Sequence, residues 1–258
     1  MMRMKIDFKI KIVVLCLALV TIFITYNCLL YKQKKINYIA LGDSIAEGIN
    51  SYSVVDYGYT DYIGDYLKER NILNFYTKEF SKSGYTTKDV INDIENNKVI
   101  EINDKKVYLK ESLRESDLVT LTIGANDFIK YFSIDNIEEK LKNIESTKKN
   151  IDEIVKEVEK TIQLIKKYAK NQIIVTGYYN PLPRFNTLKS KIDEIVKYYN
   201  NQINEICEEL NVDYVDIFEI FDGNEKLLPN PLNIHPSKDG YKLIADLIIK
   251  NINSWQKV

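Results

Sequence analysis

The chain contains a single histidine, His235, among its 258 residues. A serine hydroxyl is a weak nucleophile at neutral pH unless an adjacent base accepts its proton. Ser44 follows an apolar run and precedes a predicted helix, where its hydroxyl would be exposed beside free backbone N–H groups. If imidazole activates Ser44, His235 must be the base. The two residue types together predict nucleophilic catalysis, although Ser44 alone could cap a helix and His235 alone could lie in a surface turn.

Two further positions could bind an oxyanion. Asn126 closely follows the apolar run 118–123, and its side-chain amide could donate a hydrogen bond. Gly84 could offer an unhindered backbone N–H. Taken singly, Asn126 could be a turn residue bonded to its own backbone, and Gly84 an ordinary turn glycine.

The elements that position these residues follow from the hydrophobic pattern. Five short β-rich runs alternate with helical patterns; they span residues 36–41, 74–80, 118–123, 172–176 and 212–218. Apolar residues from Leu141 to Ile165 recur at helical spacings apart from one seven-residue gap, and a final helix is expected from near Pro236 to about Ile252. Strands alternating with helices predict a single α/β domain whose parallel sheet is covered on both faces.

Ligands of such sheets lie beyond the carboxyl ends of the strands. The polar, glycine-containing segments should therefore follow the apolar runs. Ser44, Gly84 and Asn126 each come within a few residues of the end of a run, and His235 precedes the last predicted helix. The pattern therefore predicts that these residues meet at one edge of the sheet.

In order and context, these segments resemble the SGNH (GDSL-type) serine hydrolase family. The resemblance covers roughly residues 36–252, and its blocks are Gly42-Asp43-Ser44, Gly84, Gly124-x-Asn126-Asp127 and His235-Pro236. It implies a three-layer α/β/α sandwich with a five-stranded parallel sheet. It also implies ester or thioester hydrolysis through an acyl-Ser44 intermediate, with His235 as base and with no metal or organic cofactor. The oxyanion hole that it implies consists of the N–H groups of Ser44 and Gly84 and the side-chain amide of Asn126.

One position departs from the family pattern. The family places an Asp three residues before the histidine, where this chain has Leu232. Asn233, or a backbone carbonyl near residues 231–232, could accept from the imidazole instead, and we assign Asn233 and Asp43 supporting roles. Asp239 is expected to interact with the helix N-terminus. Without a carboxylate, and beside a helix start, the pKa of His235 should be depressed.

The leading segment predicts a membrane anchor. Residues 12–31 carry no charge over 20 residues, which at about 1.5 Å per residue spans the hydrocarbon core of a bilayer. Residues 1–11 form a short basic tail, and residues 32–258 are expected to form the hydrolase domain, outside the cell membrane. The alternative is a cleaved signal peptide and secretion, although no small-residue cleavage site closes the run.

The remaining features narrow the function. A net charge of −1, from 36 basic and 37 acidic residues, argues against a nucleic-acid partner. Cys207 is the only cysteine after residue 31 and is expected in the core. Residues 51–62 are interpreted as an amphipathic helix that packs on the sheet, and the alternative is that they border the active site. The favoured function is a membrane-anchored esterase of the lipase or lysophospholipase kind, acting on a small-molecule or lipid ester. The alternatives are a carbohydrate O-deacetylase acting on cell-wall polymers and a non-catalytic binding protein; the oligomeric state is left open.

Overall fold

The computed structural model describes residues 13–23, 35–131, 137–182, 187–231 and 233–252. The chain divides into two compact units, Met1–Lys35 and Ile36–Val258. In the first unit, residues 13–23 are helical. None of the described helices is long and apolar enough to cross a membrane. The predicted basic tail, and residues 12 and 24–31 of the predicted span, lie outside the described residues.

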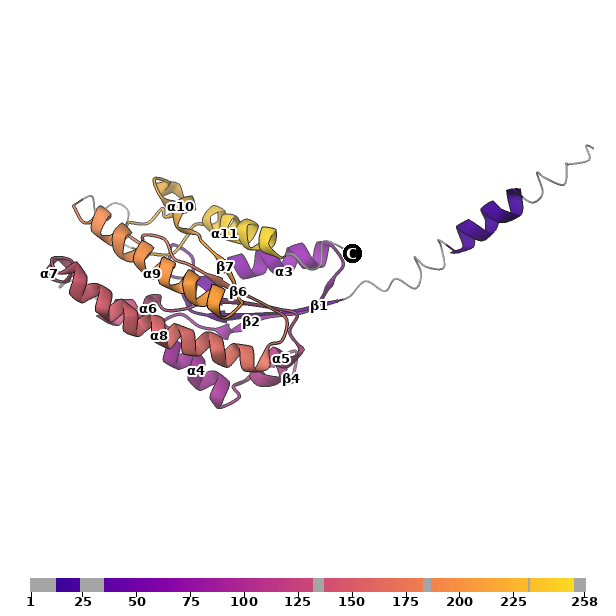
Figure 1. Cartoon of the computed structure of the whole chain (residues 1–258), viewed down its shortest axis with the longest axis horizontal. Helices are drawn as coiled ribbons and strands as arrows, with labels where there is room; N and C mark the ends of the chain where they lie inside the picture. Colours follow the sequence, from indigo (N-terminus) through magenta and orange to yellow (C-terminus); the bar gives the residue numbers. More distant parts are fainter. Residues whose placement is uncertain (1–12, 24–34, 132–136, 183–186, 232, 253–258) are drawn as a thin grey trace, which may run out of the picture. The chain divides into compact units, whose positions relative to one another are not determined.

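The second unit is built on a five-stranded parallel sheet, as predicted (Figure 1). In spatial order its strands are β2 (Leu73–Ser81), β1 (Ile36–Gly42), β5 (Leu118–Thr122), β6 (Gln172–Thr176) and β7 (Asp213–Val215). All five residues of β5 are buried, which suits a central strand covered on both faces. The parallel arrangement brings the carboxyl ends of all five strands to the same edge.

Helices cover both faces of this sheet and make three layers. Ile39 and Leu41 of β1 face the core formed with four helices: α4 (Thr87–Glu95), α5 (Leu109–Glu115), α8 (Ile144–Tyr168) and α9 (Lys189–Glu209). Tyr38 and Ala40 alternate to the opposite core, under α3 (Tyr59–Glu69) and α11 (Lys238–Asn251). Figure 1 shows α3 and α11 on one side of the strands and α8 on the other.

The gap in the apolar series of α8 has a simple explanation. Thr147 occupies the missing position, is 1% exposed, and donates its hydroxyl to the Lys140 carbonyl at 3.0 Å. A buried hydroxyl with a partner is tolerated in a core position. Cys207 is fully buried on α9, as predicted.

Several elements differ from the sequence prediction. The run 212–218 is only partly a strand, because β7 ends at Val215 and Phe218 begins the short helix α10 (Phe218–Phe221). The amphipathic helix predicted for residues 51–62 is wrong over most of its length: α3 begins only at Tyr59, and residues 51–57 form turns and a bridge between Ile49 and Val55.

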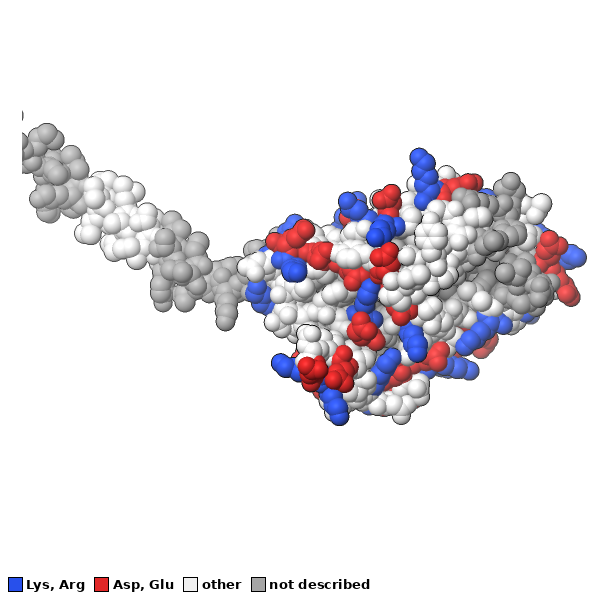
Figure 2. Space-filling model, turned by 180° about the vertical axis from the view of Figure 1, so that it is seen from behind, with Lys and Arg blue, Asp and Glu red and all other residues white. Residues whose placement is uncertain are grey.

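Other short elements were not predicted. They are the hairpin β3 (Val99–Ile102) and β4 (Lys105–Tyr108), α6 (Ala125–Tyr131), α7 (Ile137–Lys140) and the 3-10 turn η2 (Glu225–Leu227), whereas α2 (Ser44–Glu47) is the helix predicted to begin at Ser44. On the face shown in Figure 2, acidic and basic side chains are interspersed over the Ile36–Val258 unit.

Candidate active site

The position of Ser44 is set by a close approach between two strands. β1 ends at Gly42, which has a φ of +135°, and a Cβ there would lie 2.0 Å from the Thr122 carbonyl oxygen. That same oxygen accepts the N–H of Asp43 at 3.0 Å. Asp43 then caps α2 by accepting the Ile45 N–H at 3.0 Å. Ser44 is therefore the first residue of a helix, where its own N–H has no acceptor within that helix.

The structure brings Ser44 and His235 together across 191 residues. The Nε2 atom of His235 lies 2.8 Å from the Ser44 hydroxyl. On the other side of the ring, Nδ1 lies 2.6 Å from Oδ1 of Asn233. Asn233 thus occupies the place that the sequence left open among several groups, while Leu232 lies outside the described residues.

The hydrogen bonds around Asn233 determine the tautomer of the imidazole. Its Oδ1 also accepts the backbone N–H of His235 at 2.9 Å, and a backbone N–H can only donate. The oxygen end of the amide therefore faces His235, so Nδ1 must carry a proton to bond with it. Nε2 is then the unprotonated nitrogen, and it faces the Ser44 hydroxyl as a general base requires.

Burial lowers the pKa of His235 to about 4 because a low-dielectric site disfavours the charged imidazolium. The direction agrees with the sequence expectation, but the cause differs. α11 begins at Lys238 with Ser237 as its N-cap, so His235 lies before the first helical turn. The imidazole is neutral at pH 7 and is available to accept a proton.

Asn126 lies on α6, directly beyond the end of β5. One N–H of its side chain is committed to the Tyr85 carbonyl at 2.9 Å. An amide nitrogen has two N–H groups, so a second donor remains. Gly124, with a φ of +116°, makes the turn from β5, and a Cβ there would lie 2.3 Å from the Tyr199 hydroxyl.

Gly84 lies in the loop after β2. It is exposed, has a φ of +84°, and would meet no atom within 4 Å if it carried a Cβ. Two backbone N–H groups tie the loop to the Ser44 segment: that of Lys82 donates to the Gly42 carbonyl at 3.0 Å, and that of Ser83 donates to Glu47 Oε2 at 2.6 Å. The structure thus places the loops of all three predicted oxyanion donors at the same edge of the sheet.

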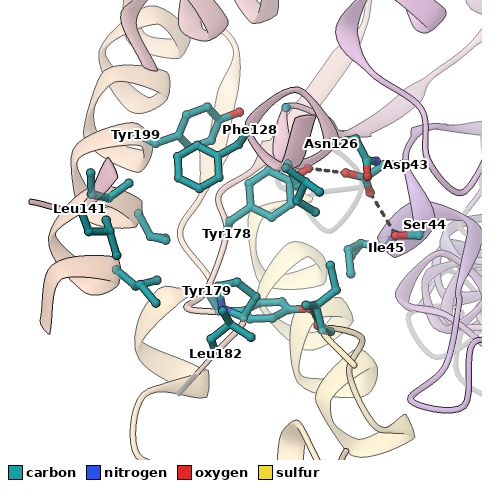
Figure 3. Close-up of a pocket in the computed structure, with 18 residues that line it drawn as sticks. Asp43, Ser44, Ile45, Asn126, Phe128, Leu141, Tyr178, Tyr179, Leu182 and Tyr199 are labelled. Atoms are coloured by element: carbon teal, nitrogen blue, oxygen red, sulfur yellow. Dashed lines mark hydrogen bonds between the residues drawn. The ribbon is translucent and has the colours of Figure 1, made fainter. Parts of the chain in front are cut away.

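Tyr178, which the sequence analysis did not single out, supports the Ser44 segment. It follows β6, and its hydroxyl donates to Oδ2 of Asp43 (Figure 3). Asp43 is 1% exposed, and burial raises its pKa to about 7. The position of Tyr178 just after β6 could have marked it as a candidate site residue. Tyrosine, however, is not a residue type that by itself indicates a catalytic site.

Two other side chains hold the neighbouring loops. Tyr179 donates its hydroxyl to the Ile234 carbonyl at 2.7 Å, next to His235. The side-chain amide of Asn200, on α9, makes two hydrogen bonds with the backbone of Tyr178. It accepts the Tyr178 N–H at 2.9 Å and donates to the Tyr178 carbonyl at 2.8 Å. The β6 loop therefore supports both Asp43 and the segment that carries His235.

A cavity of about 110 Å³ opens beside Ser44. Asp43, Ser44 and Asn126 lie at one end of it, and Leu141 lies at the other (Figure 3). Most of its remaining lining is apolar: Phe128, Ile129, Leu182, Ile192, Ile195 and Val196. The cavity suits a short apolar group attached to a carbonyl held at Ser44. Within the described ranges, no group of three or more His, Cys, Asp or Glu residues is placed to hold a metal ion.

Comparison with known proteins gives concordant results. Residues 40–243 match the GDSL-like lipase/acylhydrolase family. The spore germination lipase LipC of Bacillus licheniformis is 20% identical over 213 residues, which cover 82% of this chain and 93% of LipC.

Two solved structures share the fold. The lipase Lip_vut3 from a goat rumen metagenome has a TM-score of 0.66 at 19% identity, covering 84% of this chain and 97% of its own. The acetylxylan esterase Axe2 of Geobacillus stearothermophilus has a TM-score of 0.60 at 21% identity, covering 87% and 98%.

Proposed function

Since this chain belongs to the GDSL-like lipase/acylhydrolase family and is a carboxylic ester hydrolase, we propose that it cleaves esters of short to medium apolar acyl chains through an acyl-Ser44 intermediate. The observation that carries the proposal is the 2.8 Å contact between Ser44 Oγ and the unprotonated Nε2 of His235. The contact lies at the mouth of an apolar cavity.

The steps follow from the groups at the site. Ser44 Oγ attacks the ester carbonyl carbon while His235 Nε2 takes its proton, and the carbonyl oxygen becomes an oxyanion. His235 then gives the proton to the leaving alkoxide as the C–O bond breaks. A water molecule, deprotonated by the same nitrogen, attacks the acyl-enzyme and releases the carboxylic acid and Ser44.

The oxyanion is bound by the backbone N–H groups of Ser44 and Gly84 and the second N–H of Asn126. Preorganised donors of this kind are each worth roughly 2.7–4 kcal/mol of transition-state stabilisation. Asn126 is well suited because its other N–H already fixes the amide against Tyr85. Asn233 holds the imidazole in the required tautomer, and Asp43 holds the turn that presents Ser44.

The size of the cavity favours acyl groups longer than acetyl. An apolar cavity of roughly 150 Å³ accepts a benzene molecule, so the 110 Å³ cavity should hold an apolar chain of about four or five carbons. Most of its lining is apolar, and the aliphatic side chains in it cannot form hydrogen bonds with a sugar.

Carbohydrate O-deacetylation is the second candidate. The Gly84 loop is exposed and offers open space, which suits a bulky alcohol such as a glycan. An acetyl group would leave most of the apolar cavity empty, whereas a longer acyl chain would fill it. The cavity therefore favours the first candidate function over deacetylation.

A substrate series tests both candidates. With p-nitrophenyl esters of two to twelve carbons, kcat/KM should peak at four to six carbons and exceed that for acetylated xylooligosaccharides. Ser44→Ala should lose nearly all turnover, whereas Ser146→Ala, an exposed serine on α8, should keep it. A peak at acetate with faster glycan deacetylation would favour the second candidate, and unchanged turnover in Ser44→Ala would reject the mechanism.

We also propose that residues 12–31 anchor the chain in the cell membrane with residues 32–258 outside. The support is the uncharged 20-residue run. The full chain should stay in carbonate-washed membranes, and its hydrolase domain should be digested by protease added to intact cells. Recovery from the medium with a new N-terminus after the run would show cleavage and secretion instead.

A further inference from the structure

Ser53, in the loop that joins α2 and α3, has an unusual backbone conformation. Six non-glycine residues in the described part of the chain have positive φ, and five are Asn or Asp, which tolerate this region: Asn71, Asn97, Asn103, Asp104 and Asn211. The sixth is Ser53, with a φ of 62°. Glycine would fit there without strain, and strained positions cluster at functional sites.

The side chain of Ser53 reaches the catalytic segment. Its Oγ accepts a hydrogen bond from Nδ2 of Asn233 at 2.8 Å, across 180 residues. The other end of the same amide accepts both the backbone N–H and the Nδ1–H of His235. The Asn233 amide is therefore held at both ends, by Ser53 on one side and by His235 on the other.

The loop is built to keep the Ser53 hydroxyl in place. The Asn50 side chain accepts the N–H groups of Tyr52 and Val54 at 2.9 and 3.2 Å. The Ser53 N–H donates to the Asn50 carbonyl at 2.9 Å. The loop is also tied to the His235 segment, because Asn230 Nδ2 donates to the Ser51 carbonyl at 2.9 Å.

An amide next to a catalytic imidazole carries a specific risk. A carboxylate can only accept from Nδ1, whereas an amide turned around would donate to Nδ1 and leave the proton on Nε2. In a Ser–His–Asp triad, replacing the carboxylate by an amide costs about 10⁴ in kcat because the wrong tautomer forms. A site that uses Asn233 therefore needs its amide oriented by other groups.

We propose that Ser53 is a positioning residue, which orients the Asn233 amide and thereby keeps the proton of His235 on Nδ1 and the free lone pair facing Ser44. The proposal rests on the proposed roles of Ser44 and His235. Ser53 acts through Asn233 and touches neither the substrate nor the reacting atoms.

A double-mutant cycle tests the proposal with the full-length protein. Ser53→Gly suits the positive φ and removes the side chain with its hydroxyl. It should lower kcat for p-nitrophenyl butyrate roughly three- to tenfold, as expected for one lost hydrogen bond, with KM unchanged within about twofold. In an Asn233→Asp background the same change should alter kcat by less than about twofold, because a carboxylate has no N–H end to misplace. Val54→Ala, an exposed change in the same loop, is the matched control and should leave kcat unaltered.

The single histidine allows a readout that does not depend on activity. With ¹⁵N-labelled histidine, only His235 gives imidazole signals, and its two ring nitrogens report the tautomer directly. At pH 7 the wild type should show Nδ1–H, and Ser53→Gly should show a measurable Nε2–H population that Val54→Ala lacks. An equal loss of kcat in both backgrounds with an unchanged tautomer would overturn the proposal. Full turnover by Ser44→Ala would instead reject the proposed function. The tautomer measurement does not depend on turnover, so it would still test whether Ser53 orients the Asn233 amide.

Discussion

The two halves of the candidate site are held in place by different means. Ser44 is placed by the sheet itself: β1 ends against β5, Gly42 permits the contact, and Asp43 caps the helix that follows. His235 lies in a segment without helix or strand, held by side-chain hydrogen bonds from Asn233 and Tyr179. The nucleophile thus depends on backbone packing and the base on a few polar side chains. Damage to the first half should cost stability, whereas damage to the second should cost rate and alter its pH dependence.

The largest effect is expected at Gly42. In Gly42→Ala the new Cβ would lie 2.0 Å from the Thr122 carbonyl, so the strands must separate or α2 must shift. We expect a loss of about 3–5 kcal/mol in the free energy of unfolding, measured by urea denaturation.

Gly223→Ala is the matched control, because Gly223 also has a positive φ, of 70°, but open space around it. It should lose only about 1–2 kcal/mol from backbone strain. Equal losses in the two variants would show that contact with β5 does not position Ser44.

On the histidine side, Asn233→Asp should change the pH dependence. The wild-type base stays neutral until the pH approaches about 4, so the acid limb of kcat/KM should lie well below pH 6. A carboxylate at position 233 would favour imidazolium and raise the pKa of His235, which should move the acid limb upward by roughly one to two pH units.

Asp43, whose pKa is raised to about 7, titrates in both proteins, so the difference between the two profiles isolates His235. Superimposable acid limbs would contradict the assignment of Asn233 as the partner of Nδ1.

Tyr178→Phe should have a smaller effect, and one that depends on pH. The folded pKa of Asp43 is raised from 3.8 to about 7, so the folded state binds the extra proton between those values and this group's contribution to stability falls as the pH rises through that window. The Tyr178 hydroxyl favours the ionised form, which is present above pH 7. Its removal should cost about 1–2 kcal/mol at pH 8 and less at pH 5, by urea unfolding at each pH.

Tyr198→Phe, which removes a hydroxyl bonded to Asp152 on the surface, is the control and should cost less than about 0.5 kcal/mol at both pH values. A loss for Tyr178→Phe that is the same at pH 5 and pH 8 would mean that its hydroxyl does not act on the charge of Asp43.

The same contrast explains how far the sequence could predict the site. The alternation of β-rich runs with helical patterns predicted the parallel sheet. Ligands lie at the carboxyl ends of the strands in such sheets, which predicted that Ser44, Gly84 and Asn126 lie at one edge. Asn233 was left among several alternatives. Tyr178 and Ser53 were missed because their hydroxyls act on residues 135 and 180 positions away, which local patterns cannot reveal.

Two of the errors in secondary structure have local causes. Residues 51–57 seemed amphipathic, but the Asn50 side chain bonds the backbone into a tight loop and leaves Tyr52 and Val54 exposed. The β3–β4 hairpin did have a signal: Asn103 and Asp104 both have positive φ, as a two-residue hairpin turn requires, and both residue types favour such turns.

The most direct test of the account is covalent trapping by a fluorophosphonate at pH 7.5, with the adduct located by peptide mass spectrometry. We predict one adduct per chain, on Ser44, formed by the wild type and by Ser146→Ala but at least a thousandfold more slowly by His235→Ala, since the chain has no second imidazole. An adduct on another residue, or undiminished labelling without His235, would contradict the assignment of Ser44 and His235 as nucleophile and base.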